Sequence, residues 1–254
     1  IYSMKKLLII LLCSFSLSAF SQNDSLYAMK NGVIIHSFSI DSNHIDSIIF
    51  YRPNITTPSI TDADGNVYTS VTIGTQEWMS ENLRTTKYSD GTDIPNVAYN
   101  IAWKNLSTGA WCNYDNSSSN DATYGKLYNW YAVETEKLCP TGWHVPTDSE
   151  WTVLTDYLAA DGHSGAEGNA LKSTSGWNSG GNGTDDYGWN GLPGGYRYDD
   201  DGYFYLIGNN GYWWSSSQLN TYSAWYRNLY FNDDYVYRND YLKDYGFSVR
   251  CLRD

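Results

Sequence analysis

The sequence predicts an α+β fold in which two helices in the middle of the chain lie between groups of strands, with a small β appendage in front. Three observations predict it. Runs of β-branched residues before residue 80 alternate with turn residues, two mid-chain segments carry apolar residues at helical spacing, and further strand patterns follow in a glycine-rich region. This order of strands, helices and strands is typical of the α+β class.

The first 21 residues are typical of an export signal. Met4 and the two lysines after it form a short basic region, and an apolar stretch follows from Leu7 to Phe20. This stretch is shorter than the roughly 20 apolar residues of a membrane span. We expect cleavage before Gln22, after which no segment stays inserted in the membrane. Residues 1–3 are expected to lie upstream of the true start.

Lipid modification at Cys13 is the alternative to cleavage. A lipid-modified cysteine follows a small residue, whereas Leu12 precedes Cys13, which also lies in the middle of the apolar stretch. Cleavage is therefore favoured. The chain is expected to be secreted or held on the outer cell surface.

A short leader segment, residues 22–52, precedes a linker. Apolar runs at 33–35 and 45–50 alternate with polar residues, which predicts two or three short strands. Prolines and small polar residues at 53–60 cannot continue a ladder and predict the linker. The main domain is predicted to span residues 61–254, an ordinary domain size.

A turn and a hairpin open the main domain. The string Asp-Ala-Asp-Gly-Asn at 62–66 precedes a β-branched run at 67–73, and Gly74-Thr75-Gln76 then turns the chain into a second strand at 77–79. The aspartates resemble half of a calcium loop, but an EF-hand needs a glutamate at its twelfth position and flanking helices. A turn is favoured over structural calcium, and no other cofactor is expected.

Two helices are predicted in mid-chain. Between Tyr124 and Glu136, apolar residues at 127, 130, 131 and 133 share one helical face. The second helix begins with a capping box, Thr-Asp-Ser-Glu at 147–150, has a buried stripe at 151, 154 and 158, and ends at Asp161-Gly162.

The region from Ser173 to Gly211 is rich in Gly, Asn, Ser and Asp and is predicted to be loops with short strands. Within it, residues 198–205 are predicted to form a hairpin with an acidic triplet, 199–201, at its tip. A cation site at this tip is the alternative to a solvated turn.

The composition excludes some classes of partner. The formal charge is −12, and removal of Lys5 and Lys6 with an acid-free signal makes it −14. Such a chain repels phosphate backbones and anionic lipids, so we expect no nucleic-acid partner and no binding to membrane surfaces. Its 24 Tyr and 11 Trp instead indicate a large core or a recognition surface, because tyrosine serves both.

Three cysteines remain after cleavage: Cys112, Cys139 and Cys251. An oxidising compartment favours one disulfide, and the odd number leaves one thiol unpaired. The sequence alone leaves all three pairings open. The four histidines lack zinc-ligand spacing with one another or with these cysteines, so no metal ligands are predicted.

Several motifs occur in a fixed order: Tyr-Gly-Lys-Leu-Tyr-Asn-Trp-Tyr-Ala-Val at 124–133, Cys-Pro-Thr-Gly-Trp-His-Val-Pro-Thr-Asp-Ser-Glu-Trp at 139–151, Leu-Pro-Gly-Gly-Tyr-Arg at 192–197, Trp-Trp-Ser-Ser-Ser at 213–217 and Gly-Phe-Ser-Val-Arg-Cys at 246–251. Residues 62–254 therefore resemble the Fibrobacter succinogenes major paralogous domain. The leader segment is similar to one in secreted proteins of the Bacteroidetes.

This resemblance implies a C-type-lectin-like fold with two helices, paired terminal strands and long loops, distantly related to formylglycine-generating enzymes. It also implies a Cys139–Cys251 disulfide, with Cys112 free and buried. Those enzymes hold copper with a nearby pair of cysteines, and such a pair is missing when Cys139 is bonded to Cys251. The chain is therefore not expected to be an enzyme.

The segment 220–246 is biased in composition: among its 27 residues are seven Tyr, four Asn and four Asp. Residues 224–232 alternate with period two, which places Trp225, Leu229 and Phe231 inward and Tyr226 and Asn228 outward. Exposed tyrosines among short polar residues are typical of antibody loops. The predicted ligand-binding residues are Tyr222, Tyr226, Asn228, Tyr230, Asn232, Asp234, Tyr235, Tyr237, Asn239, Tyr241 and Tyr245.

The resemblance adds that some C-type-lectin-like proteins are diversified near the gene's end by retroelements, in which case these positions and Ala224 would vary.

The expected function is a non-catalytic module that binds a protein or glycan. Trp213 and Trp214 could serve as a platform for a glycan or lie in the core. The alternative is a structural or assembly component of the envelope or of an adhesive appendage. A hydrolase with paired carboxylates is less favoured, since nothing singles out a pair.

Overall fold

The computed structural model describes residues 17–18, 25–30, 33–39 and 60–254. The chain divides into two compact units, residues 1–56 and 57–254, and the division falls within the predicted linker at 53–60. Most of the predicted signal peptide, the strand expected at 45–50 and most of the linker lie outside the described residues.

The described part of the first unit is a three-stranded antiparallel sheet in the order β1-β2-β3. It consists of β1 (Leu17–Ser18), β2 (Ser25–Lys30) and β3 (Val33–Ser39). The apolar run at 33–35 lies in β3 as expected.

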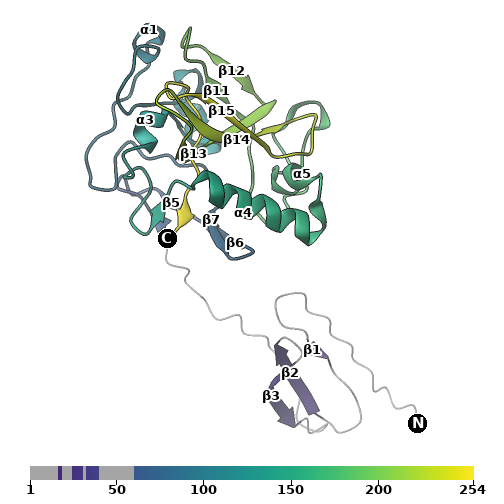
Figure 1. The fold of residues 1–254 in the computed structure, drawn as a ribbon. Helices are drawn as coiled ribbons and strands as arrows, with labels where there is room; N and C mark the ends of the chain where they lie inside the picture. The colour runs from purple at the N-terminus through teal and green to yellow at the C-terminus, as the bar shows by residue number, and fades with distance from the viewer. Residues whose placement is uncertain (1–16, 19–24, 31–32, 40–59) are drawn as a thin grey trace. The chain divides into compact units, whose positions relative to one another are not determined.

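The second unit alternates short strands and helices (Figure 1). Its strands are β4 (Ile60–Thr61), β5 (Val67–Tyr68), β6 (Ser70–Ile73), β7 (Gln76–Met79), β8 (Trp111–Cys112), β9 (Leu127–Tyr128), β10 (Trp143–His144), β11 (Gly194–Arg197), β12 (Phe204–Ile207), β13 (Asn210–Gln218), β14 (Ser223–Tyr230), β15 (Tyr237–Leu242) and β16 (Leu252–Arg253). Its α-helices are α1 (Asn100–Trp103), α2 (Asp121–Tyr124), α3 (Trp130–Val133), α4 (Asp148–Leu158) and α5 (Glu167–Leu171). Single helical turns are η1 (Tyr114–Asn116), η2 (Ser118–Asn120), η3 (Ala159–His163) and η4 (Asn178–Gly180). The predicted α+β class is confirmed.

One sheet joins the two ends of this unit. Its order is β10-β16-β7-β6, so the last strand pairs with the hairpin predicted near the domain start, and Figure 1 shows it in yellow beside β7. Leu252 lies opposite both Trp78 and His144. Beside this sheet, Cys139 and Cys251 form the predicted disulfide, with Cα atoms 6.0 Å apart, and Cys112 is buried and free.

Helix α4 begins as predicted. The Thr147 hydroxyl accepts a hydrogen bond from the Glu150 amide, and the Glu150 carboxylate accepts one from the Thr147 amide, which completes the capping box. The helix packs on β13 and β14 and buries its predicted stripe. That stripe contributes to a core of Trp78, Trp151, Leu154, Leu158, Trp189, Trp213 and Leu229.

The helix predicted at 124–136 is wrong. Instead, α2 ends at Tyr124 because Gly125 has a φ of 73°, strand β9 follows, and α3 is a single turn capped by Asn129. Tyr128 exchanges two backbone hydrogen bonds with Phe247. This long-range pairing overrides the local helical spacing, because the apolar side chains are buried against the C-terminal segment rather than along one helix face.

The other predicted turns are confirmed. Asp62 accepts hydrogen bonds from the amides of Asp64 and Asn66 and from the Tyr68 hydroxyl, so its carboxylate organises a turn. The hairpin expected at 198–205 is the connection between β11 and β12, and residues 199–201 lie in it.

Candidate functional site

The sheet β13-β14-β15 carries most of the predicted binding residues. Directly opposite residues in an antiparallel pair share a face, and Tyr226 lies opposite Asn239 and Asn228 opposite Tyr237. One face of β14 and β15 therefore carries the predicted Tyr and Asn residues, as the period-two pattern indicated. The opposite face carries Arg227, Leu229 and other residues.

The prediction that this face is open along β14 is wrong. Tyr226 and Asn228 are 3% and 0% exposed, and Tyr245, beyond β15, is 5% exposed. The reason is that β14 is the central strand of its sheet and is covered on both sides. The Phe247 ring lies 4.8 Å from that of Tyr226, and on the other side α4 contributes Asp148, which is 2.7 Å from Arg227.

The remaining predicted residues are accessible to different degrees. Tyr222, Asn232, Asp234, Tyr235, Asn239 and Tyr241 are exposed, whereas Tyr230 and Tyr237 are half-buried. Trp225, expected to face inward with Leu229, is also half-buried, and the guanidinium of Arg238 lies over its ring, 3.5 Å from the centroid. Trp213 and Trp214 are core residues and do not form a platform.

The structure adds three tyrosines that the sequence analysis missed, all from the β11–β12 hairpin. Tyr196 stacks on Tyr245 with centroids 5.8 Å apart, and Tyr245 in turn stacks on Tyr241 at 4.2 Å. Tyr205 contacts both Tyr196 and Tyr198, at 5.7 and 6.0 Å. The hairpin thus extends the aromatic face of the sheet.

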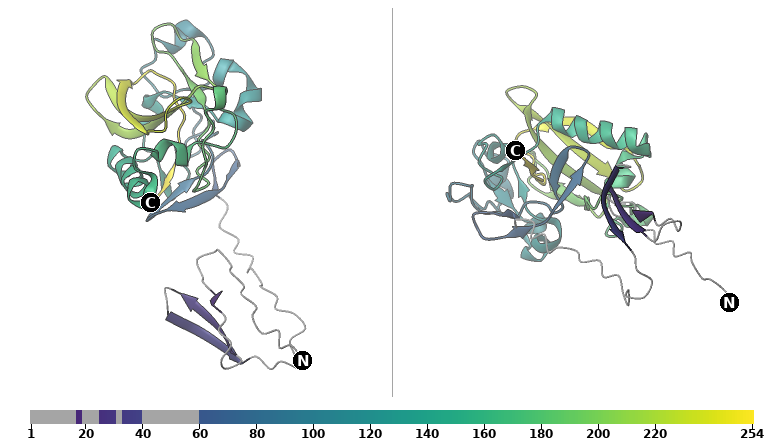
Figure 2. Two further views of the ribbon diagram at one scale, coloured as in Figure 1. Left: turned by 90° about the vertical axis from the view of Figure 1, so that its right-hand side faces the viewer. Right: turned by 90° about the horizontal axis from the view of Figure 1, so that it is seen from below.

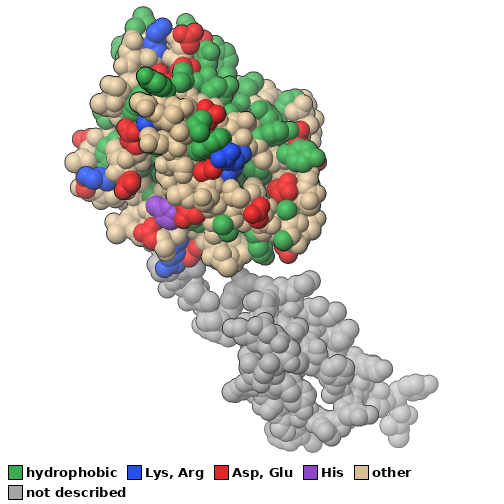
Figure 3. Space-filling view, in the orientation of Figure 1, with side chains coloured by type: hydrophobic (Ala, Val, Ile, Leu, Met, Phe, Trp, Pro, Cys, Tyr) green, Lys and Arg blue, Asp and Glu red, His purple; other side chains and the backbone are tan. Residues whose placement is uncertain are grey.

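We call the accessible part of this face the tyrosine surface. It consists of Tyr196, Tyr198, Tyr205, Tyr230, Tyr237 and Tyr241. Figure 3 shows hydrophobic side chains, a class that includes tyrosine, gathered on the upper right of the domain, where Figure 1 places β12. The surface lies on a buried layer of Tyr212, Tyr226, Tyr245 and Phe247.

Two aspartates hold tyrosines of this surface in place by the same arrangement. Asp201 accepts a hydrogen bond from the Tyr203 amide and another, at 2.6 Å, from the Tyr205 hydroxyl. Asp233 does the same with the Tyr235 amide and the Tyr237 hydroxyl, at 2.7 Å. Each aspartate therefore fixes both a turn and a ring.

A repeated sequence motif could have identified these positions. Asp-x-Tyr-x-Tyr occurs at 201–205 and again at 233–237. An Asx side chain often bonds the amide two residues on, which would have placed both motifs at strand entrances. Asn220 caps the amide of the exposed Tyr222 in a similar way.

The hydrogen bonds set the ionisation of this surface. Hydrogen bonds to Asp201 and Asp233 raise the pKa of Tyr205 and Tyr237, and burial raises the pKa of Tyr196 to about 12. Hydrogen bonds from the Tyr235 amide and the Tyr237 hydroxyl lower the pKa of Asp233. Near neutral pH these phenols are therefore protonated while Asp233 is ionised.

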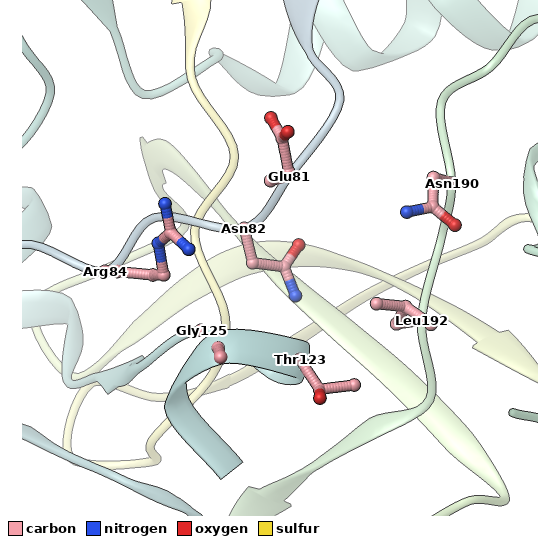
Figure 4. A pocket seen from close by; sticks show the side chains of 8 residues that line it. Glu81, Asn82, Arg84, Thr123, Gly125, Asn190 and Leu192 are labelled. Carbon is pink, nitrogen blue, oxygen red and sulfur yellow. The ribbon is translucent and has the colours of Figure 1, made fainter. Parts of the chain in front are cut away.

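The domain also has hollows away from the tyrosine surface. Figure 4 shows one of about 250 Å³ lined by Glu81, Asn82, Arg84 and Asn190 among others. Its polar groups are mostly engaged: Glu81 accepts hydrogen bonds from Thr69, and Asn82 accepts them from Arg250 and Trp213. Another, of about 700 Å³, lies beside Cys139 and His144.

Neither the cysteines nor the histidines form a metal centre among the described residues, where no group of three or more His, Cys, Asp or Glu side chains could hold an ion. His144 bonds Asp254 and Glu150, at 2.7 and 3.1 Å. Burial raises the pKa of the Cys112 thiol to about 12. Within the same described part of the chain, no helix is long and apolar enough to cross a membrane.

Comparison with known proteins finds a matching family. The model of the Fibrobacter succinogenes major domain matches residues 71–253, which is well over half of the chain. No curated protein and no solved structure matches.

Proposed function

The chain belongs to the Fibrobacter succinogenes major domain family, and we propose that it is a non-catalytic binding module, secreted or displayed on the cell surface, whose tyrosine surface recognises a protein or glycan ligand. The observation that carries this proposal is the continuous series of ring contacts from the β11–β12 hairpin to β15. It brings together tyrosines that are more than 40 residues apart in the sequence, such as Tyr196 and Tyr241.

The geometry of the rings supports recognition. Tyr205 and Tyr241 are 38% and 42% exposed, yet each ring has a fixed neighbour beside or beneath it. A ring held in its bound orientation loses little conformational entropy when a ligand covers it. The exposed amide of Asn239 on the same face offers both a donor and an acceptor.

The state of the sulfur atoms favours a non-catalytic role. Cys139 is bonded to Cys251, and the free thiol of Cys112 is buried with a raised pKa. None of these three sulfurs is then available as a thiolate for the copper-dependent chemistry of the formylglycine-generating enzymes that the resemblance implies as distant relatives.

Diversification by a retroelement is a narrower form of the proposal. It fits the predicted positions whose side chains are exposed, such as Tyr222, Tyr235 and Tyr241. It does not fit Tyr226 or Asn228, which are buried. A template repeat beside the gene, with adenine substitutions at codons of exposed residues, would support this form, and a template that varies the buried codons would contradict it.

The test of function is a ligand search with matched variants. We expect a glycan array and a surface-protein pull-down to give at least one partner for the wild type that is lost by the double variant Tyr205→Ala, Tyr241→Ala. Tyr157→Ala is the control, because Tyr157 is similarly exposed, 37%, but lies on α4 and contacts Tyr187 instead. If the double variant keeps every partner, the tyrosine surface is not the binding site.

A further inference from the structure

Strand β15 is an outer strand of its sheet, and the structure leaves its other edge unpaired within the described residues. The sheet order is β13-β14-β15, and Figure 2 shows these olive to yellow strands at one side of the domain. Every residue from Arg238 to Leu242 is exposed. Such an edge is a template for another strand.

The ladder determines which backbone groups face outward. The Lys243 amide donates to the Tyr222 carbonyl at 3.0 Å, directly after β15. Hydrogen-bonded pairs alternate along an antiparallel ladder, so Tyr237, Asn239 and Tyr241 direct their backbone groups toward β14. The amides and carbonyls of Arg238, Asp240 and Leu242 therefore point to the open edge.

The sequence of this edge is self-complementary. It reads Tyr237-Arg238-Asn239-Asp240-Tyr241, so a two-fold axis at Asn239 places each Arg238 opposite Asp240 of a second copy. Arg238 and Asp240 are also the residues whose backbone groups point outward. Charge pairing and backbone pairing thus select the same register.

The neighbouring registers are unfavourable. A shift in one direction places Arg238 opposite Arg238, and a shift in the other places Asp240 opposite Asp240, so both oppose like charges. A register in which one strand is shifted by an odd number of residues from the proposed one pairs outward-pointing with inward-pointing backbone groups. Such a register cannot form the ladder.

The charges around Arg238 are complementary to an incoming carboxylate. Arg238 and Arg227 share Asp148, at 2.8 and 2.7 Å, so two guanidiniums meet one carboxylate. Asp148 binds Nε and Nη2 of Arg238, which leaves Nη1 without a partner in the described part of the chain. The Asp240 carboxylate acts on Arg238 of its own strand through its charge, but it makes no hydrogen bond or close ion pair with any described residue.

We propose that two copies of this chain associate through β15, antiparallel about a two-fold axis at Asn239, with Arg238 of each copy paired to Asp240 of the other. The sheets of the two copies then form one continuous sheet, and both tyrosine surfaces lie on the same face of it, since directly opposite residues share a face. The proposal goes beyond the binding function and does not depend on it. A single short strand buries little area, so the dimer is weak and depends on concentration.

Analytical ultracentrifugation of the full chain over a concentration series up to the millimolar range tests this directly. We expect a monomer–dimer equilibrium for the wild type, weakened at least about tenfold in Asp240→Lys, because two attractive pairs become repulsive. Asp156→Lys makes the same change of charge on an exposed position of α4 and should leave association unchanged. A wild type that stays monomeric, or equal weakening by both variants, overturns the proposal.

Cysteine cross-linking tests the register independently of any effect on folding. In the proposed register the two Asn239 residues form a non-hydrogen-bonded pair with Cα atoms about 4.5 Å apart, within disulfide range. Asn239→Cys should therefore give a covalent dimer under mild oxidation, and Asp240→Cys should not. Efficient cross-linking of Asp240→Cys instead would show a different register and overturn the assignment.

Discussion

Tyr241 and Tyr245 lie almost parallel, with ring centroids 4.2 Å apart and an interplanar angle of 13°, although Tyr241 is exposed and Tyr245 is buried. This pair connects the tyrosine surface to the core. An exposed ring held on a buried ring is a rigid contact element.

Removal of the Tyr245 ring should destabilise the domain. Tyr245→Ala deletes a buried ring that contacts Tyr241, Tyr196 and Phe247, and we expect a loss of about 3 kcal/mol in the free energy of unfolding. Tyr245→Phe keeps the ring and should lose about 1 kcal/mol. Urea denaturation measures both, and equal losses for the two variants would contradict the role given to the ring.

The Cys139–Cys251 disulfide should contribute strongly to stability, because the two cysteines are 112 residues apart in the sequence. A cross-link over such a loop reduces the entropy of the unfolded chain and is worth about 4 kcal/mol. We expect this loss in denaturant unfolding of the Cys139→Ala, Cys251→Ala variant. Unchanged stability would show that the bond adds nothing to the pairing of β16.

His144 should make stability fall as pH rises. Burial opposes its protonation, but hydrogen bonds to Asp254 and Glu150 outweigh burial and raise its pKa above the ordinary 6.5. The contribution of protonated His144 to the stability of the folded state is therefore fully present below pH 6.5 and lost as pH rises through the raised pKa. Glu150 acts at acid pH. Burial opposes its ionisation, but hydrogen bonds from Thr147 and His144 outweigh burial and lower its pKa from 4.5. Its contribution to the stability of the folded state is therefore lost as pH falls through that lowered pKa.

Thermal unfolding of wild type and His144→Gln between pH 5 and 9 checks this dependence. The expected result is a decline in the melting temperature of the wild type above about pH 6.5 that the variant lacks. Parallel curves for the two proteins would exclude a contribution from His144.

Arg250 should be required for folding rather than for binding. It is fully buried, its guanidinium lies 3.9 Å from the Trp189 ring, and it donates to Asn82 Oδ1 and to the Trp189 carbonyl. Arg250→Ala would leave the Trp189 carbonyl unpaired, remove one of the two donors to Asn82 Oδ1 and open a cavity, with an expected loss of about 4 kcal/mol. Calorimetry measures the loss, and a stable variant would contradict the packing described for this centre.

The sequence predicted local structure best where the signal was itself local. The capping box at 147–150 and the hairpins expected at 67–79 and 198–205 depend on nearby residues, and the structure has the capping box, a hairpin over 70–79 and a hairpin over 194–207. The segment 124–136 did not, because its hydrogen bonds run to Phe247, more than 100 residues away. Helical spacing of apolar residues cannot distinguish one buried helix face from a segment buried by distant strands.

The candidate site was predicted in part for a related reason. The alternation along β14 correctly grouped Tyr226, Asn228 and Tyr230, but alternation alone does not show that a central strand is covered on both faces. Tyr196 and Tyr205 were missed because they reach the site from another hairpin. Contacts that form only in three dimensions join the two segments, among them the Tyr196–Tyr245 stacking and the backbone pair of Arg197 and Gly246.

The central claim, that the tyrosine surface binds the ligand, is tested most directly by footprinting. Once a partner is found, tyrosine nitration followed by mass spectrometry should show Tyr205 and Tyr241 protected when the partner is bound, while Tyr157 on α4 stays reactive. If Tyr205 and Tyr241 remain as reactive in the complex as in the free protein, the ligand binds elsewhere and the account is contradicted.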